Sequence, residues 1–396
     1  MTNRPWRILP VIVVSQFCCT SLWFATNGVI DPLAAHFGLG PGALGHLTSF
    51  VQFGFISGTL LFALLTLSDR FSPSRVFLAC ALAGAGFNAG CLWEGNTLAS
   101  LLAWRFMTGF FLAGIYPVGM KIAADYYEKG LGKSLGFLVG ALVVGTALPH
   151  LLRDGIGAGS WIPVVVFTSG LAVLGGLLMW GLVPDGPFRK RSQKPDFSAF
   201  FRVFRNPSFR AASFGYFGHM WELYAFWAFV PVILGTFGAL HPEAALSVPA
   251  WSFAIIAIGG PACVAGGYLS LRLGPARTAG FALLFSGLCC LLSPLVYLSG
   301  NGPLLVTFLL FWGMMVVADS PQFSTLVARH APAEARGTAL TIVNCIGFSI
   351  TIASIQLLNV LQVWIGPAYL FVVLALGPLF GLLALTRQHK NSLHLD

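Results

Sequence analysis

The sequence predicts an all-α membrane protein whose twelve transmembrane helices form two pseudo-symmetric bundles of six. The first observation is composition: 57% of the 396 residues are hydrophobic and only 9% are charged, against roughly 25% charged residues in an ordinary soluble domain. The second is that the apolar residues occur in long runs, and a run of about 20 residues spans a bilayer as a helix. A soluble surface would need far more solvating side chains, so composition alone decides the class.

Twelve apolar runs follow one another along the chain. The first begins after Arg4 and Arg7, and it is too long for the core of a signal peptide, so we treat it as a helix. We place the first six spans at residues 8–30, 44–66, 76–94, 98–122, 134–152 and 160–183. We place the second six at residues 211–237, 247–270, 278–299, 303–326, 337–361 and 366–386.

One long polar stretch, residues 184–210, interrupts this series and carries a cluster of basic residues. It predicts an N-terminal six-helix bundle over residues 1–183, a cytoplasmic basic linker over 184–210, and a C-terminal six-helix bundle over 211–396. Two loops share a pair of arginines in the same register: Arg70 and Arg75 after the second helix, Arg272 and Arg277 after the eighth. The halves therefore look like repeats of one unit.

The basic residues also predict orientation, because cytoplasmic loops carry an excess of Lys and Arg. With the N-terminus inside, all but two of the 22 Lys and Arg residues fall on the cytoplasmic side. The exceptions are Arg105, inside the fourth span, and Arg153, at an outer helix end. We therefore expect a multi-pass protein of the cell inner (cytoplasmic) membrane with both termini in the cytoplasm. The net charge of +9 is then a topology signal and does not indicate nucleic-acid binding.

The motifs of the loops and of the fourth helix resemble those of the major facilitator superfamily. The family loop Gly-x-x-x-Asp-Arg-x-Gly-Arg is matched after the second helix by Asp69, Arg70 and Arg75, with Leu65 and Ser72 replacing the glycines. The fourth helix has the family's membrane-embedded arginine, Arg105, followed by Gly109, and the tenth helix has Pro321 where the fourth has Pro117. The resemblance implies transport by alternating access around a midplane site, and it implies a conformational latch role for Asp69, Arg70 and Arg272.

Three ionisable residues in the second half are candidates for proton coupling: Glu222, His219 and Asp319. An ionisable residue inside a span costs about 2.5–3.5 kcal/mol on insertion scales, so each needs a reason. His219 and Glu222 are three residues apart and therefore share a helix face. A carboxyl group in a low-dielectric cavity can load and release a proton near neutral pH, and a histidine one turn away could share that proton. The alternative is a structural pair that locks the seventh helix to a neighbour.

Arg105 is the candidate for a fixed charge that contacts an anionic substrate, because an arginine stays charged at physiological pH. A structural ion pair is the alternative, with Asp319 and Glu222 as the two candidate partners. The family's cavity is lined by helices 1, 4, 7 and 10, and this implies further substrate-binding residues: Asn27, Tyr116, Trp221 and Tyr224.

We therefore expect a secondary active transporter that moves a small organic solute by alternating access, with an anion as one candidate. We expect transport to be coupled to protons through these residues, by symport or by antiport. Two alternatives stay open, an efflux antiporter for drugs or cations and a membrane sensor that keeps the fold without transport. We expect its partners to be the small-molecule substrate, protons and the lipid bilayer, and we expect a monomer. No catalytic constellation, cofactor motif or metal-ligand spacing is present, and Gly130-Leu-Gly132-Lys133-Ser134 lacks the first glycine of a phosphate loop.

Overall fold

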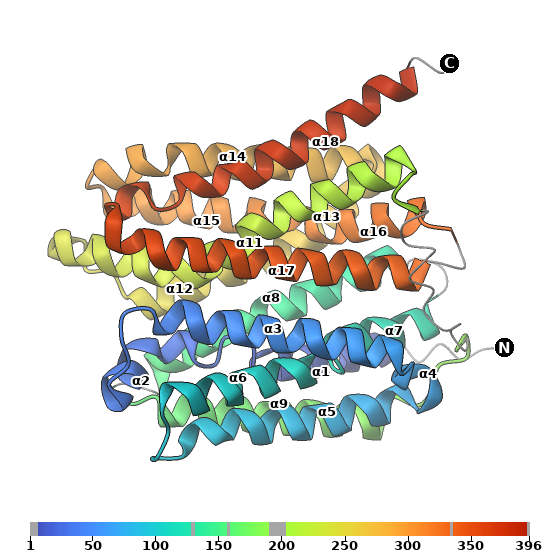
Figure 1. The fold of residues 1–396 in the computed structure, drawn as a ribbon, viewed down its shortest axis with the longest axis horizontal. Helices are drawn as coiled ribbons and strands as arrows, with labels where there is room; N and C mark the ends of the chain where they lie inside the picture. Colours follow the sequence, from blue (N-terminus) through green and yellow to red (C-terminus); the bar gives the residue numbers. More distant parts are fainter. Residues whose placement is uncertain (1–6, 128–130, 157–158, 190–202, 333–335, 394–396) are drawn as a thin grey trace. The chain divides into compact units, whose positions relative to one another are not determined.

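The structure is a computed structural model that describes residues 7–127, 131–156, 159–189, 203–332 and 336–393. The chain folds as two compact units, Met1–Lys194 and Pro195–Asp396, and Figure 1 colours the helices of the first from blue to green and those of the second from yellow-green to red. Most of the predicted basic linker, residues 190–202, lies outside the described residues.

The first unit consists of helices joined by short turns. Its long helices are α1 (Ile8–Thr20), α3 (Ala43–Leu64), α5 (Pro73–Ala89), α6 (Leu98–Leu112), α7 (Tyr116–Tyr126), α8 (Leu131–Gly155) and α9 (Ile162–Leu182). Its short helices are η1 (Asn27–Val29), α2 (Ile30–Phe37), α4 (Leu67–Arg70) and η2 (Gly90–Leu92).

The second unit is built in the same way. Its long helices are α11 (Pro207–Leu240), α12 (Val248–Ala257), α13 (Gly259–Leu273), α14 (Pro275–Leu298), α15 (Gly302–Ala318), α16 (Ser320–His330), α17 (Arg336–Trp364) and α18 (Leu376–Leu393). Its short helices are η3 (Pro242–Ala244), η5 (Pro367–Tyr369) and η6 (Val372–Ala375).

Eleven helical stretches among the described residues are long and apolar enough to cross a membrane, and Ile8–Thr20 is a shorter apolar helix. Together they occupy the twelve predicted spans, so the all-α membrane fold is confirmed. The first span differs from its predicted extent of 8–30, because α1 ends at Thr20 and turns with i→i−3 hydrogen bonds follow, such as Leu22 N–H to Cys19 O. Ser and Thr hydroxyls compete for backbone groups here: Ser21 donates to the Cys18 carbonyl.

The two units repeat one packing pattern. In the first, α1 packs on α8 and α9, and α5 packs on α6 and α9. In the second, α11 packs on α17 and α18, and α14 packs on α15 and α18. The repeat read from the loop arginines is therefore a repeat of helix topology.

The fourth and tenth spans are both interrupted just before a proline. Helix α7 begins at Tyr116 with Pro117 in its first turn, and α16 begins at Ser320 with Pro321 in its first turn. Proline is tolerated at this position because the first N–H groups of a helix have no intrahelical partner. The tenth span therefore breaks at Asp319, between α15 and α16.

Glycines let α3 and α6 approach closely. A Cβ on Gly109 would lie 1.9 Å from the Val51 carbonyl oxygen, and one on Gly54 would lie 1.9 Å from the Phe106 carbonyl oxygen. Small residues at such contacts are how membrane helices reach short interaxial distances. This contact fixes Arg105, which lies one turn before Gly109 on α6.

Candidate functional site

His219 and Asp319 form a buried pair in the second unit. His219 lies in the middle of α11, and Asp319 is the single residue between α15 and α16. The Nδ1 atom of His219 lies 2.8 Å from Oδ1 of Asp319, and both side chains are 1% exposed. The helix break thus places a carboxylate against the imidazole of the neighbouring span.

The contact between these two groups is an ion pair by distance, but it lacks the alignment of a good hydrogen bond. Among the described residues, neither nitrogen of His219 and neither carboxylate oxygen of Asp319 has a well-aligned hydrogen-bond partner. The imidazole is flanked by two aromatic rings, Tyr216 at 6.0 Å and Phe323 at 6.2 Å between centroids. Buried polar groups are usually satisfied, and those that are not are often functional.

Glu222 is held by a different set of donors. Its carboxylate accepts hydrogen bonds from Trp312 Nε1 on α15 at 2.6 Å and from the Ser286 hydroxyl on α14 at 2.9 Å. The thiol of Cys290, also on α14, lies 3.5 Å from Oε1 of Glu222, the oxygen that Trp312 also contacts. Although His219 and Glu222 belong to one helix, the structure gives them separate partners, and Glu222 joins α11 to α14 and α15.

Arg105 is fully buried in the first unit and bonds neutral groups. Its guanidinium donates to Asn88 Oδ1 on α5 at 3.1 Å and to the backbone carbonyls of Leu22 and Trp23. These carbonyls belong to the interrupted part of the first span, where the Leu22 carbonyl accepts a long i→i−3 bond from Ala25 N–H at 3.5 Å, and Arg105 supplies an additional donor. Among the described residues, no carboxylate contacts Arg105.

Arg105 and Glu222 take part in corresponding three-helix contacts. In the first unit, a donor on the fourth span (Arg105) reaches the first span, with Asn88 of the third span beside it. In the second unit, a donor on the tenth span (Trp312) reaches Glu222 on the seventh span, with Ser286 of the ninth span beside it. The two units therefore share this three-helix contact, but its ionisable residue is an arginine in the first unit and a glutamate in the second.

The interruption of the first span also gathers polar side chains. Asn27 Nδ2 donates to the Thr48 hydroxyl at 2.8 Å, and Trp23 Nε1 donates to Gln52 Oε1 at 3.2 Å, so both bonds lead to α3. A Cβ on Gly28 would lie 2.7 Å from the Pro149 backbone, which places α8 on the other side. Several buried atoms here have no hydrogen-bond partner among the described residues: Thr26 Oγ1, Asn27 Oδ1, Gln52 Nε2, Thr146 Oγ1 and His150 Nε2.

The other predicted binding residues are not brought together. Tyr116 begins α7 and is partly buried. Trp221 donates from Nε1 to the Val373 carbonyl of η6 at 3.3 Å. Tyr224 is buried with its ring centroid 5.3 Å from that of Phe348 on α17. Trp221 and Tyr224 thus contact different neighbours of α11.

The predicted latch loop is bonded to the segment that follows α9. The side chain of Asp69 lies outside the described residues, Arg70 Nε donates to Thr66 Oγ1 at 3.2 Å, and Arg272 is exposed in the last turn of α13. The Ser72 hydroxyl donates to Asp185 Oδ1 at 2.6 Å, and Arg189 bonds both Asp185 and the Phe71 carbonyl. Asp185 and Arg189, which the sequence analysis did not single out, are therefore the residues that tie this loop.

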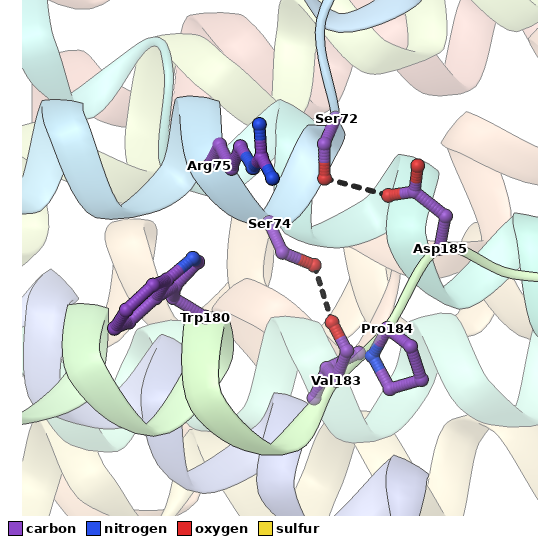
Figure 2. Close-up of a pocket in the computed structure, with 7 residues that line it drawn as sticks. All are labelled: Ser72, Ser74, Arg75, Trp180, Val183, Pro184 and Asp185. Carbon is purple, nitrogen blue, oxygen red and sulfur yellow. Dashed lines mark hydrogen bonds between the residues drawn. The ribbon is translucent and has the colours of Figure 1, made fainter.

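A pocket of about 460 Å³ lies beside this loop, between the start of α5 and the end of α9 (Figure 2). Its lining includes Ser72, Arg75, Trp180 and Asp185. None of the residues predicted to bind substrate or protons lines it. It is a separate feature of the first unit.

Repeated units of membrane-spanning helices with ionisable side chains buried inside them define a class, the polytopic α-helical transport proteins. A family model described as Major Facilitator Superfamily matches residues 12–355. The chain belongs to the major facilitator superfamily, as its motifs predicted, and it is a transporter of that family.

Relatives and solved structures agree with this assignment. The 4-hydroxybenzoate transporter PcaK of Pseudomonas putida is 24% identical over 382 residues, covering 86% of this chain and 82% of that protein. The niacin transporter NiaP of Acinetobacter baylyi is 32% identical over 162 residues, so the match spans 35% of this chain and only 36% of that protein. The structure of the proton:xylose symporter XylE superposes with a TM-score of 0.74 at 14% identity, covering 97% of this chain and 94% of that one. At that identity the likeness concerns the fold.

Proposed function

We propose that this protein is a proton-coupled secondary transporter that moves a small organic acid across the inner membrane by alternating access. It acts as a monomer with both termini in the cytoplasm. The observation that carries the proposal is the buried contact between His219 and Asp319, 2.8 Å apart at the break of the tenth span. Histidine and carboxylate chains inside membrane spans are the usual components of proton relays.

The pair suits proton coupling because its two buried groups can hold different numbers of protons, so that proton content sets the charge buried at the helix break. With one proton the pair is an ion pair or two neutral groups, and a second proton makes it a buried cation. Glu222 is the second candidate, and its carboxylate is held by contacts from Trp312, Ser286 and Cys290.

The substrate class rests on charge and on relatives. Arg105 is a buried cation that no described carboxylate neutralises, so the first unit favours an anion. Relatives named for 4-hydroxybenzoate and niacin add that an aromatic carboxylate is the first class to test. Asn27 and the unpartnered atoms of Gln52, Thr146 and His150 would bind the substrate's polar groups.

The test is uptake of radiolabelled 4-hydroxybenzoate and niacin into proteoliposomes, with the outside at about pH 5.5 and the inside at about pH 7.5. Protein-free liposomes measure passive entry of the neutral acid and are subtracted. We expect accumulation that a protonophore abolishes. Asp319→Asn should lose accumulation but keep exchange of labelled for unlabelled substrate at equal pH.

Other outcomes would identify the alternatives. Proton-driven movement of an organic cation such as ethidium, without movement of either acid, would indicate an efflux antiporter. Saturable binding of an acid without flux would indicate a sensor. Accumulation that persists without a proton gradient would refute proton coupling while leaving transport intact.

A further inference from the structure

The pocket beside the latch loop has a cation, an exposed aromatic ring and a place at the ends of two spans. Helix α5 begins at Pro73 and α9 ends at Leu182, so the pocket lies where the apolar helices give way to polar loop. Trp180 is 53% exposed in the last turn of α9, and Leu182 beside it is 55% exposed. Exposed aromatic and apolar side chains at a span's end are typical of the membrane interface.

Arg75 is the charged residue of the pocket whose side chain has no hydrogen-bond or ion-pair partner among the described residues. Asp185 is already paired with Arg189 and accepts from the Ser72 hydroxyl, and the Ser74 hydroxyl donates to the Val183 carbonyl at 2.6 Å. Arg75 is exposed, and among the described residues no acceptor bonds its guanidinium. Figure 2 shows Arg75 beside Ser72 and Ser74, with Trp180 on the neighbouring helix.

The start of α5 adds a second attraction for an anion. Ser72 occupies the N-cap position, but its hydroxyl is directed to Asp185, so α5 has no side-chain cap. The N-terminus of a helix carries a partial positive charge and favours phosphate groups. Arg75 lies in that first turn, and it lines the same volume of about 460 Å³ as Ser72 and Ser74 of the helix start.

We propose that this pocket binds the phosphate group of a membrane phospholipid, with the Arg75 guanidinium as its ligand and Trp180 against the adjoining glycerol and acyl chain. Guanidinium binds phosphate oxygens in a bidentate manner, which gives geometry as well as charge. A soluble phosphate ion would bind the Arg75 guanidinium in the same way, but it has no apolar part to contact Trp180 and Leu182. The bound lipid would tie α5 to α9 next to the Asp185 contacts.

The repeat supplies a matched control. Arg277 follows Pro275 at the start of α14 as Arg75 follows Pro73 at the start of α5, and it too is exposed. Arg277 does not line the pocket of the first unit, whose lining residues are Ser72, Ser74, Arg75, Trp180, Val183, Pro184 and Asp185. The two arginines therefore differ in surroundings and agree in charge and helix position.

The experiment is a thermal-shift titration of delipidated full-length protein in detergent with phosphatidylglycerol. A lipid that binds the folded protein raises the melting temperature by mass action. Arg75→Gln should weaken the apparent lipid affinity about tenfold, which corresponds to one charge-assisted hydrogen bond. Trp180→Leu should also weaken it, and Arg277→Gln should leave it unchanged.

Three results would overturn the proposal. Equal losses in Arg75→Gln and Arg277→Gln would mean that lipid binds by general surface charge. An equal shift with inorganic phosphate at the same concentration would assign the pocket to a soluble anion. An unchanged titration in Arg75→Gln would remove the pocket from lipid binding altogether. Because the readout is lipid affinity, it is independent of whether the protein transports an organic acid.

Discussion

The imidazole of His219 lies 2.8 Å from the carboxylate of Asp319, although the two residues are 100 positions apart in the chain. The contact depends on the break before Pro321, which leaves Asp319 outside both α15 and α16. It links the seventh span to the interrupted tenth span. Any change in the protonation of either residue therefore acts at this helix break.

Replacing His219 by Gln should uncouple transport from protons. Glutamine keeps a polar side chain at this position but cannot change its charge, so uptake should lose its increase at low external pH. In the unmodified protein the uptake rate should rise as the external pH falls, because protons enter with the substrate down their gradient. The measurement is initial uptake rate against external pH at constant internal pH. An unchanged profile would contradict the role of His219.

Glu222→Gln should affect stability more than coupling. The amide presents a donor where Trp312, Ser286 and Cys290 all donate, so at least one bond is lost and one polar group is left unsatisfied. This costs about 1–3 kcal/mol, seen as a lower melting temperature in detergent. If the variant instead keeps its stability and loses the pH dependence of uptake, the coupling proton belongs to Glu222.

Thr146→Val should weaken substrate binding without destabilising the protein. The Thr146 hydroxyl is buried without a partner among the described residues, so removing it from the free protein should raise the melting temperature or leave it unchanged. If the hydroxyl binds substrate, KM should rise about threefold to tenfold. Thr108→Val is the matched control, because that buried hydroxyl donates to the Trp104 carbonyl of its own helix at 2.8 Å. Equal KM values in both variants would count against this site.

Gly109→Ala should severely destabilise the first unit. The new Cβ would lie 1.9 Å from the Val51 carbonyl oxygen, so α3 and α6 must separate. Gly86→Ala is the control, since nothing lies within 4 Å of a Cβ there. Melting temperatures of the two variants should differ clearly, with Gly86→Ala close to the unmodified protein. A similar loss in both would show that the α3–α6 contact is not responsible, because Gly→Ala by itself favours a helix.

Asp185→Asn should loosen the latch loop. The change removes the negative charge that forms the ion pair with Arg189, and it weakens the hydrogen bond that residue 185 accepts from the Ser72 hydroxyl. We expect faster proteolysis or hydrogen exchange in the loop around Ser72, with KM for substrate unchanged because the loop lies outside the predicted binding residues. Ser57→Ala is a suitable control, because its exposed hydroxyl bonds only its own helix at Phe53 O. Unaltered exchange in Asp185→Asn would contradict a latch at this position.

The class, the twelve spans, the repeat and the family could all be predicted from the sequence. These follow from apolar run length, from the placement of arginines and from local proline and glycine positions, all of which act through the nearest residues and the bilayer. The break at Asp319 was also predictable, since Pro321 lacks the N–H that a continuous helix needs.

Only the tertiary structure decided which polar groups meet. Spacing placed His219 and Glu222 on one helix, but their partners come from other helices: Asp319 for the first, Trp312 and Ser286 for the second. The hydrogen bonds from Arg105 to the Leu22 and Trp23 carbonyls could not be predicted from the sequence. A continuous first helix, as the sequence predicted, would have used these carbonyls in its own backbone hydrogen bonds. Burial demands that each polar group find a partner, and that partner depends on how the helices pack rather than on sequence spacing.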